Sequence, residues 1–290
     1  MVGRAAAPEN RSMALGVATA VGSVGQEARA PIAEALLSHF PWQTVFVIFS
    51  VAILGVLLAL PMMRAPAKAP TAEASQSLTQ AVQQAFRDPS FTLIFLGFFS
   101  CGYQLGFITA HFPAMVTEMC GAIAPGSLLA SLGITTTSAL GAAAISFVGL
   151  ANIFGTLTAA WAGNHWQKKN LLAGIYAART VVGAVFILMP ITPTSVLVFS
   201  LVMGSLWLAT VPLTSGLIAQ IYGVRYMGTL YGIVFLSHQV GSFMGVWLGG
   251  RLYDIYGDYT LVWWVGIGVG AFSALVHLPV RERRLQEMPA

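Results

Sequence analysis

The 290-residue chain has little charge, because Asp, Glu, Lys and Arg make up only 8% of it, against about 25% in a typical soluble domain. Apolar residues make up 57% of the chain, and its mean hydropathy is +0.77. This composition strongly disfavours a soluble protein and is typical of a polytopic helical membrane protein. The net charge of +4 is too small to indicate a nucleic-acid partner.

Cysteine and catalytic motifs are also scarce. Cys101 and Cys120 form neither a metal-ligand spacing nor a disulfide framework. The sequence has no HExxH zinc motif, no GxSxG nucleophile turn and no phosphate-binding loop. We therefore expect no enzyme activity, no bound metal or cofactor, and no coupling to bound ATP. No signal-peptide pattern precedes the first apolar stretch, so we expect insertion through the chain's own spans.

Long apolar runs are what the sequence has in abundance. A helix crosses about 30 Å of hydrocarbon with about 20 residues, and eight runs come close to or exceed this length. They are Met13–Leu37, Thr44–Met63, Phe91–Ala114, Ala143–Gly163, Leu171–Pro190, Ser195–Ile221, Gly228–Gly250 and Leu261–Pro279. The predicted fold class is an all-α polytopic membrane protein with eight transmembrane helices, and the even count places both termini on one side.

Two connectors between these runs are long. Residues 64–90 are polar and indicate a linker between two bundles, with a surface helix over Ser77 to Phe86. Residues 115–142 are nearly uncharged and rich in small residues. They fit an ordered external loop, a half-inserted segment or a ninth span.

Positive charge decides the topology. With eight spans, one side of the membrane receives eleven cations and the other receives only Arg251. The eleven are Arg4, Arg11, Arg64, Lys68, Arg87, Lys168, Lys169, Arg225, Arg281, Arg283 and Arg284. The positive-inside rule then places both termini and the 64–90 linker in the cytoplasm. A ninth span within 115–142 would reverse the later connectors, so we reject it.

Small residues recur along two of the predicted helices. One stripe consists of Ser237, Gly241, Gly245 and Gly249, and the other consists of Gly149, Asn152, Thr156, Ala159 and Gly163. Such stripes let helix backbones approach closely in a membrane. They predict tight helix packing and do not by themselves indicate a ligand.

Polar side chains at membrane depth are costly unless they face a partner or a cavity, and so they mark candidate site residues. They are Tyr103, Gln104, His111, Asn152, Trp207, Thr210, Thr214, His238, Gln239 and Ser242. An aromatic and histidine lining suits a small polar solute. For His238 two interpretations stay open, a hydrogen-bonded structural histidine or a cavity ligand that couples to protons.

Four charged residues fall inside the predicted spans. Glu27, Arg29 and Glu34 lie toward the outer end of the first span, where snorkelling explains them, although Glu27 also fits a proton-coupling group in a cavity. Arg179 lies about 13 Å from Lys169 along its helix and therefore near the midplane. At that depth it is a candidate for neutralising an anion.

Three sequence runs resemble the major facilitator superfamily, and more narrowly bacterial members near the monocarboxylate and oxalate/formate antiporter branch. The first run is FFSCGYQLGF at Phe98–Phe107, continuing to His111-Phe112-Pro113. The second is GTLYGIVFLSHQ at Gly228–Gln239, and the third is GGRLYD at Gly249–Asp254. The resemblance implies that residues 13–63 correspond to helices 5 and 6 of a twelve-helix fold and 91–279 to helices 7 to 12. Helices 1 to 4 have no counterpart.

The resemblance implies that the chain consists of four parts. Residues 1–63 would be a remnant of the N-terminal half, 64–90 the cytoplasmic linker, 91–280 the complete C-terminal half and 281–290 a cytoplasmic tail. It also places the predicted span containing Arg179 outside the central cavity, which implies a structural or inter-helix role for that residue. The family's cytoplasmic signature loop has Asp-Arg where this chain has Asn164-His165, which puts that loop's role in gating in doubt.

The functional prediction is a secondary active transporter in the bacterial inner membrane. It would move a small organic anion, monocarboxylate-like, together with a proton or against a counter-anion, by alternating access. The predicted substrate-binding residues are His238, Gln239, Tyr103, Gln104, Asn152, Trp207 and Thr210, with His238 and Glu27 as candidates for proton coupling. The rival hypothesis is a truncated, non-transporting membrane protein that is inactive or acts by associating with another chain.

Overall fold

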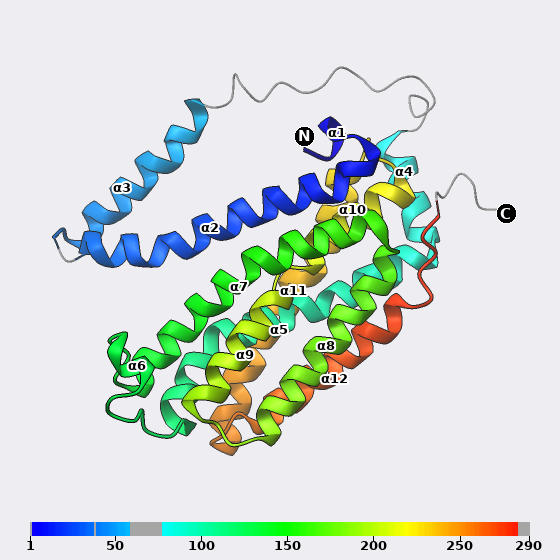
Figure 1. Cartoon of the computed structure of the whole chain (residues 1–290). Coiled ribbons are helices and arrows are strands. Elements are labelled where there is room, and N and C mark those ends of the chain that lie inside the picture. Colours follow the sequence, from blue (N-terminus) through cyan, green and yellow to red (C-terminus); the bar gives the residue numbers. More distant parts are fainter. Residues whose placement is uncertain (1, 38, 59–76, 284–290) are drawn as a thin grey trace.

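The computed structural model describes residues 2–37, 39–58 and 77–283, without the side chains at positions 4, 5, 8, 26–31 and 34. Every element of regular structure in these residues is a helix (Figure 1). The α-helices are α1 (Val2–Ala5), α2 (Arg11–Leu37), α3 (Trp42–Gly55), α4 (Leu78–Arg87), α5 (Pro89–Met119), α6 (Leu128–Ser131), α7 (Thr137–His165), α8 (Lys168–Leu188), α9 (Pro193–Leu206), α10 (Thr210–Tyr222), α11 (Met227–Tyr256) and α12 (Thr260–His277). A short 3₁₀ helix, η1 (Pro8–Asn10), precedes α2.

A helix lies at each of the eight predicted spans. Five helical segments of the described chain are both long and apolar enough to cross a membrane, namely α5, α7, α8, α9 with α10 taken together, and α12. The remaining three are α2, α3 and α11, of which α3 belongs to a shorter apolar helical stretch, Trp42–Leu58. The all-helical class is therefore confirmed, whereas the count of eight membrane-spanning helices stays a prediction.

The two long connectors differ in structure. Between α5 and α7, residues 120–136 contain only the four-residue helix α6, so no ninth span lies in this segment. The predicted surface helix of the linker is present as α4, which starts after Ser77. The Ser77 hydroxyl accepts from the Gln80 N–H at 3.2 Å, while the Gln80 side chain accepts from the Ser77 N–H at 2.8 Å. Residues 59–76 of the predicted linker lie outside the described residues.

The predicted glycine stripe of α11 packs directly against α5. Ser237, Gly241, Gly245 and Gly249 are all buried. A Cβ atom added at Gly241 would collide with the Phe99 carbonyl oxygen, and one added at Gly245 would collide with that of Tyr103. On α5, a Cβ atom at Gly102 would likewise meet the His238 carbonyl oxygen. The two backbones are therefore in contact, as close packing through small residues requires.

The second predicted stripe lies on α7, which packs between α2 and α9. Its five residues are buried. On the α9 side, a Cβ atom at Gly155 would collide with the Ser205 carbonyl oxygen. On the α2 side, Gly16 is in contact with Ala160. Figure 1 shows α2 running along α7, while α3 extends away from the other helices.

The two cores of the C-terminal half are apolar and aromatic. In one of them Phe112, Phe186, Phe199 and Trp263 form a cluster of contacting rings, with the Phe186 and Phe199 centroids 4.4 Å apart. Aromatic pairs of this kind add stability beyond the area that they bury. This packing holds α5, α8, α9 and α12 together around the site described next.

Candidate functional site

The predicted span Ser195–Ile221 is not continuous, which corrects the sequence-based prediction. Its helix stops at Leu206 and a second helix starts at Thr210, so residues 207–209 interrupt it. Pro212 explains part of the break, because proline has no N–H to donate to the carbonyl four residues earlier, that of Leu208. Pro212 was the available sequence signal, and the span prediction did not use it.

Arg179 of α8 binds the carbonyl end of α9 at this break. Its Nε donates to the Leu206 carbonyl at 3.0 Å, and its Nη2 donates to the same oxygen at 2.6 Å and to the carbonyl of Trp207. The side chain is 1% exposed. These bonds satisfy carbonyl groups that a helix end leaves without partners. They agree with the inter-helix role implied for Arg179.

Asn152 of α7 binds the opposite side of the break. Its Oδ1 accepts from the Leu208 N–H at 2.9 Å and from the Thr156 hydroxyl at 3.0 Å, while its Nδ2 donates to Ser23 of α2 at 2.9 Å. Asn152 is 2% exposed. Its hydrogen bonds to protein atoms therefore join α2, α7 and the start of α10, which is a positioning role.

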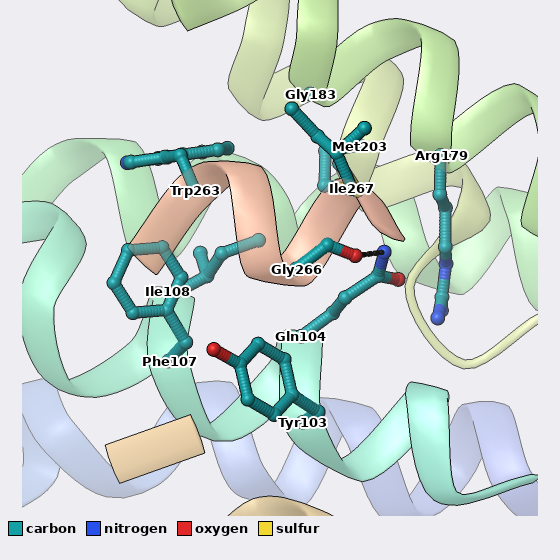
Figure 2. Close-up of a pocket in the computed structure, with 10 residues that line it drawn as sticks. All are labelled: Tyr103, Gln104, Phe107, Ile108, Arg179, Gly183, Met203, Trp263, Gly266 and Ile267. Atoms are coloured by element: carbon teal, nitrogen blue, oxygen red, sulfur yellow. Dashed lines mark hydrogen bonds between the residues drawn. The ribbon is translucent and has the colours of Figure 1, made fainter. Parts of the chain in front are cut away.

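A small cavity of about 20 Å³ lies beside the Arg179 side chain (Figure 2). The ten residues lining it come from α5, α8, α9 and α12, and they are Tyr103, Gln104, Phe107, Ile108, Arg179, Gly183, Met203, Trp263, Gly266 and Ile267. A cavity that holds one water needs roughly 10–15 Å³, so this one holds one or two water-sized groups.

Three polar atoms around this cavity are buried without a hydrogen-bond partner. They are Tyr103 Oη, Gln104 Oε1 and Arg179 Nη1. Gln104 Nε2 donates to the Gly266 carbonyl at 3.3 Å, and Figure 2 shows the amide oxygen turned toward Arg179. Figure 2 shows the Tyr103 hydroxyl pointing away from Arg179, whereas the Gln104 amide oxygen and the Arg179 guanidinium face each other. Because buried polar atoms are normally paired, these last two groups indicate a small polar occupant beside them.

His238 lies in a different, aromatic environment. Its ring stacks on Phe235 with centroids 4.9 Å apart and lies 5.3 Å from Phe98, and its Nδ1 is buried without a partner. Near it, the Cys101 thiol and the Thr210 hydroxyl are 3.4 Å apart. Gln239, the next residue, is exposed, as expected because consecutive helical residues point to different faces.

The structure thus separates the predicted substrate residues into groups. Tyr103 and Gln104 share the cavity with Arg179. Asn152, Trp207 and Thr210 surround the break between α9 and α10. His238 lines neither the cavity nor the break, and Gln239 points outward. The side chain of Glu27 is not among those described.

One charge dominates the interior of the C-terminal half. More than two turns from the helix ends of α5 and α7–α12, Arg179 is the only Asp, Glu, Lys or Arg residue. Arginine stays protonated in proteins, so this interior carries a permanent positive charge.

Comparisons with known proteins identify the family. Residues 1–246 match the family model of the Major Facilitator Superfamily. The chain is 26% identical over 278 residues to an uncharacterized MFS-type transporter, YcxA, of Bacillus subtilis (strain 168), covering 93% of this chain and 64% of that protein. It therefore spans somewhat less than two thirds of that relative's length.

The fold is also similar to solved structures. A Major Facilitator Superfamily transporter, FucP, in the outward conformation superposes with a TM-score of 0.71 at 14% identity, over 95% of this chain and 70% of that chain. A variant of the E. coli fucose:proton symporter FucP gives a TM-score of 0.67 at 13% identity over the same shares. Family membership points to a membrane transporter rather than an enzyme, and the chain belongs to the Major Facilitator Superfamily.

Proposed function

We propose that this chain is a secondary active transporter of a small organic anion, monocarboxylate-like, that works by alternating access between two halves. We further propose that it lies in the bacterial inner membrane with eight spans and both termini in the cytoplasm. Membership of the Major Facilitator Superfamily supports the transport mode, and the positive-inside bias supports the orientation.

The buried guanidinium of Arg179 is the observation that favours an anion. An ionised side chain at the centre of a bilayer costs about 2.5 to 3.5 kcal/mol on insertion scales, and Arg179 is retained there without a partner for Nη1. A fixed positive charge of this kind lowers the energy of an anion in the same low-dielectric interior and raises that of a cation.

The remaining predicted residues have distinct roles in this proposal. Tyr103 and Gln104 supply hydrogen bonds beside Arg179. His238, which lies outside the cavity beside Arg179, and Glu27 are the candidate groups for coupling transport to a proton. A counter-anion is the alternative to the proton. Asn152, Trp207 and Thr210 set the geometry of the helix break, and Gln239 offers its amide to the inter-half space.

The test is uptake by proteoliposomes that contain the purified chain. We expect saturable uptake of labelled L-lactate above protein-free vesicles, and a loss of at least tenfold in His238→Ala at equal protein incorporation. His165→Ala is the matched control, because His165 is exposed at the end of α7 and bonds only its own helix, to the Trp161 carbonyl at 2.8 Å. It should keep wild-type uptake.

Three outcomes would contradict the proposal. Uptake of fucose in place of lactate would assign the chain to a neutral substrate, and unchanged uptake in His238→Ala would remove that residue from the site. A folded chain with no uptake of any solute would favour the rival hypothesis of a non-transporting membrane protein.

A further inference from the structure

Arg179 is a buried cation whose charge is only partly balanced. Its Nε and Nη2 atoms bind the carbonyl oxygens of Leu206 and Trp207, while Nη1 is buried without a hydrogen-bond partner in a side chain that lines the cavity. The carbonyl end of a helix carries roughly half a negative elementary charge. About half of the guanidinium charge therefore remains to be balanced by another group.

Among the described residues no acidic side chain supplies that group, and the Tyr176 ring, with its centroid 5.7 Å from Arg179 Cζ, supplies only a weak cation–π contact. Within residues 2–37, 39–58 and 77–283, the recorded ion pair joins Lys168 to Glu282 at the start of α8, with 3.7 Å between Nζ and Oε1. The residues that line the cavity include no acidic side chain. In Figure 2 the polar group beside the Arg179 guanidinium is the Gln104 amide oxygen. This oxygen belongs to a neutral group and makes no hydrogen bond with Arg179.

We propose that this cavity binds one small monovalent anionic group, of the size of formate or of one carboxylate. The group is either a free anion or the carboxylate end of the transported molecule, and only the second source rests on the proposed transport function. The site lies within the C-terminal half, among α5, α8, α9 and α12.

The donors around the cavity fit this ligand. Arg179 Nη1 carries two N–H groups without a hydrogen-bond partner. Rotating the Gln104 amide by 180° would exchange its oxygen for an NH₂ group. It would also replace the 3.3 Å bond to Gly266 by a repulsive contact between two carbonyl oxygens, a cost that the attraction of the anion must offset. The amide can therefore present its oxygen to Arg179 in the empty cavity and its N–H groups to a bound anion.

The volume sets the size limit. A volume of about 20 Å³ accommodates one or two water-sized groups. It matches the two oxygens of a carboxylate and is too small for methanesulfonate. Because Arg179 also binds the end of α9, an occupant at Nη1 acts directly on the residue that holds the helix break. Anion binding and the geometry of α9 and α10 are thereby linked.

The first test is thermal unfolding of the purified chain in detergent, in sodium formate and in sodium methanesulfonate at equal ionic strength. We expect formate alone to raise the unfolding temperature saturably, by a few degrees. Gln104→Glu introduces a carboxylate of the same shape beside Arg179. It should raise the unfolding temperature in methanesulfonate and abolish the response to formate.

Gln83→Glu is the matched control, since it makes the same chemical change on the exposed face of α4 and should leave the formate response intact. Equal unfolding temperatures of the wild type in the two salts would show a cavity that holds only water, and would overturn the proposal. A formate response that persists in folded Gln104→Glu would overturn it as well. If Gln104→Glu does not fold, Gln104→Met, which removes the amide, should weaken the apparent formate affinity at least threefold, and an unchanged affinity would count against the site.

Lactate uptake separates the two sources of the anion. Competitive inhibition by formate assigns the cavity to the substrate's own carboxylate, whereas stimulation by formate assigns it to a free anion. A formate response without lactate uptake would defeat the proposed function and leave the site standing. Lactate uptake without a formate response would support the proposed function and overturn the anion site.

Discussion

The two ends of the chain are held in the fold by different means. In the C-terminal half, α5 and α11 touch through their backbones along a line of glycines, and α7 and α9 do the same at Gly155 and Gly204. In the N-terminal pair, α2 contacts α7 and α10 along one face, whereas Val45 is the buried residue of α3. Glycines 22, 25 and 55 have no neighbouring atoms within 4 Å of an added Cβ.

This difference shows where the structure tolerates change. A bundle whose backbones touch has no space for another methyl group, because protein interiors are close-packed. The apolar side chains of Ile53 and Leu54 in α3, and of Leu58 just after it, are exposed by 60% or more, and in a membrane they meet lipid. The C-terminal half is therefore expected to be the rigid unit. In the N-terminal pair α3 is the loosely held helix, whereas α2 is fixed near its start, where Gly16 meets Ala160 of α7.

The largest effect is expected from adding a methyl group between α5 and α11. In Gly102→Ala the new Cβ collides with the His238 carbonyl, so the helices must separate, at a cost of about 3 kcal/mol or more. In detergent the variant should unfold at a much lower temperature and aggregate on size-exclusion chromatography.

Gly232→Ala is the matched control on α11, because nothing lies within 4 Å of its added Cβ. It should be neutral or stabilising by up to about 1 kcal/mol, since alanine favours a helix over glycine. Equal unfolding temperatures for the two variants would show that α5 and α11 are not in backbone contact.

The next effect concerns the two halves directly. Proteolysis aimed at residues 59–76 should leave a stable fragment that contains α4 to α12, while the fragment with α2 and α3 is degraded faster, because few contacts hold α3. Mass spectrometry over a digestion time course measures both fragments. Two fragments that stay bound and equally protected would show that α2 and α3 have another packing surface, on this half or on a second copy.

A smaller effect is expected at Asn152, whose hydrogen bonds join α2 to the C-terminal half. Asn152→Ala leaves the Leu208 N–H without its partner and removes the hydrogen bond to Ser23, whose hydroxyl keeps its bond to the Thr19 carbonyl, at a cost of about 1–3 kcal/mol. In this variant, protease should cleave α2 clearly faster than in the wild type, whereas the unfolding temperature should fall only slightly. Asn170→Ala changes an exposed amide that bonds only Gln167, so it should alter neither quantity.

The smallest effect concerns Cys120, at the end of α5. Partial burial raises the pKa of its thiol, so the reactive thiolate is scarcer near neutral pH than in a free thiol. Alkylation by a membrane-impermeant maleimide should be slow at pH 7 and accelerate as the pH rises through the raised pKa.

The same reagent tests the topology. In Cys101→Ser, it should reach Cys120 from outside intact cells, whereas a cysteine replacing Gln167 should react only after permeabilisation. In Cys120→Ser the fully buried Cys101 should stay unmodified. Reaction of Cys120 only after permeabilisation would reverse the predicted orientation.

Much of the fold follows from local patterns in the sequence. Apolar length predicts a helix at every expected span, the polar linker predicts the surface helix α4, and the spacing of small residues predicts which faces of α7 and α11 are buried. Each of these signals acts within one helix, so one sequence suffices to find it.

The arrangement of the site depends on contacts between distant residues and was less predictable. The break at residues 207–209 is held by Arg179, 27 positions before Leu206, and by Asn152, 56 positions before Leu208. Adjacent residues also separate, since His238 is buried between aromatic rings while Gln239 is exposed. The helical period shows on which face of its helix a residue lies. It does not show which neighbouring helix that face contacts.

The most direct test of the account is charge selectivity in the wild-type chain. L-lactate and its neutral amide, L-lactamide, differ little in size, so their initial uptake rates into the same proteoliposomes compare charge alone. If the positive interior around Arg179 selects the substrate, lactate uptake should exceed lactamide uptake at least tenfold after subtraction of protein-free vesicles. Equal rates, or faster uptake of the amide, would contradict the account.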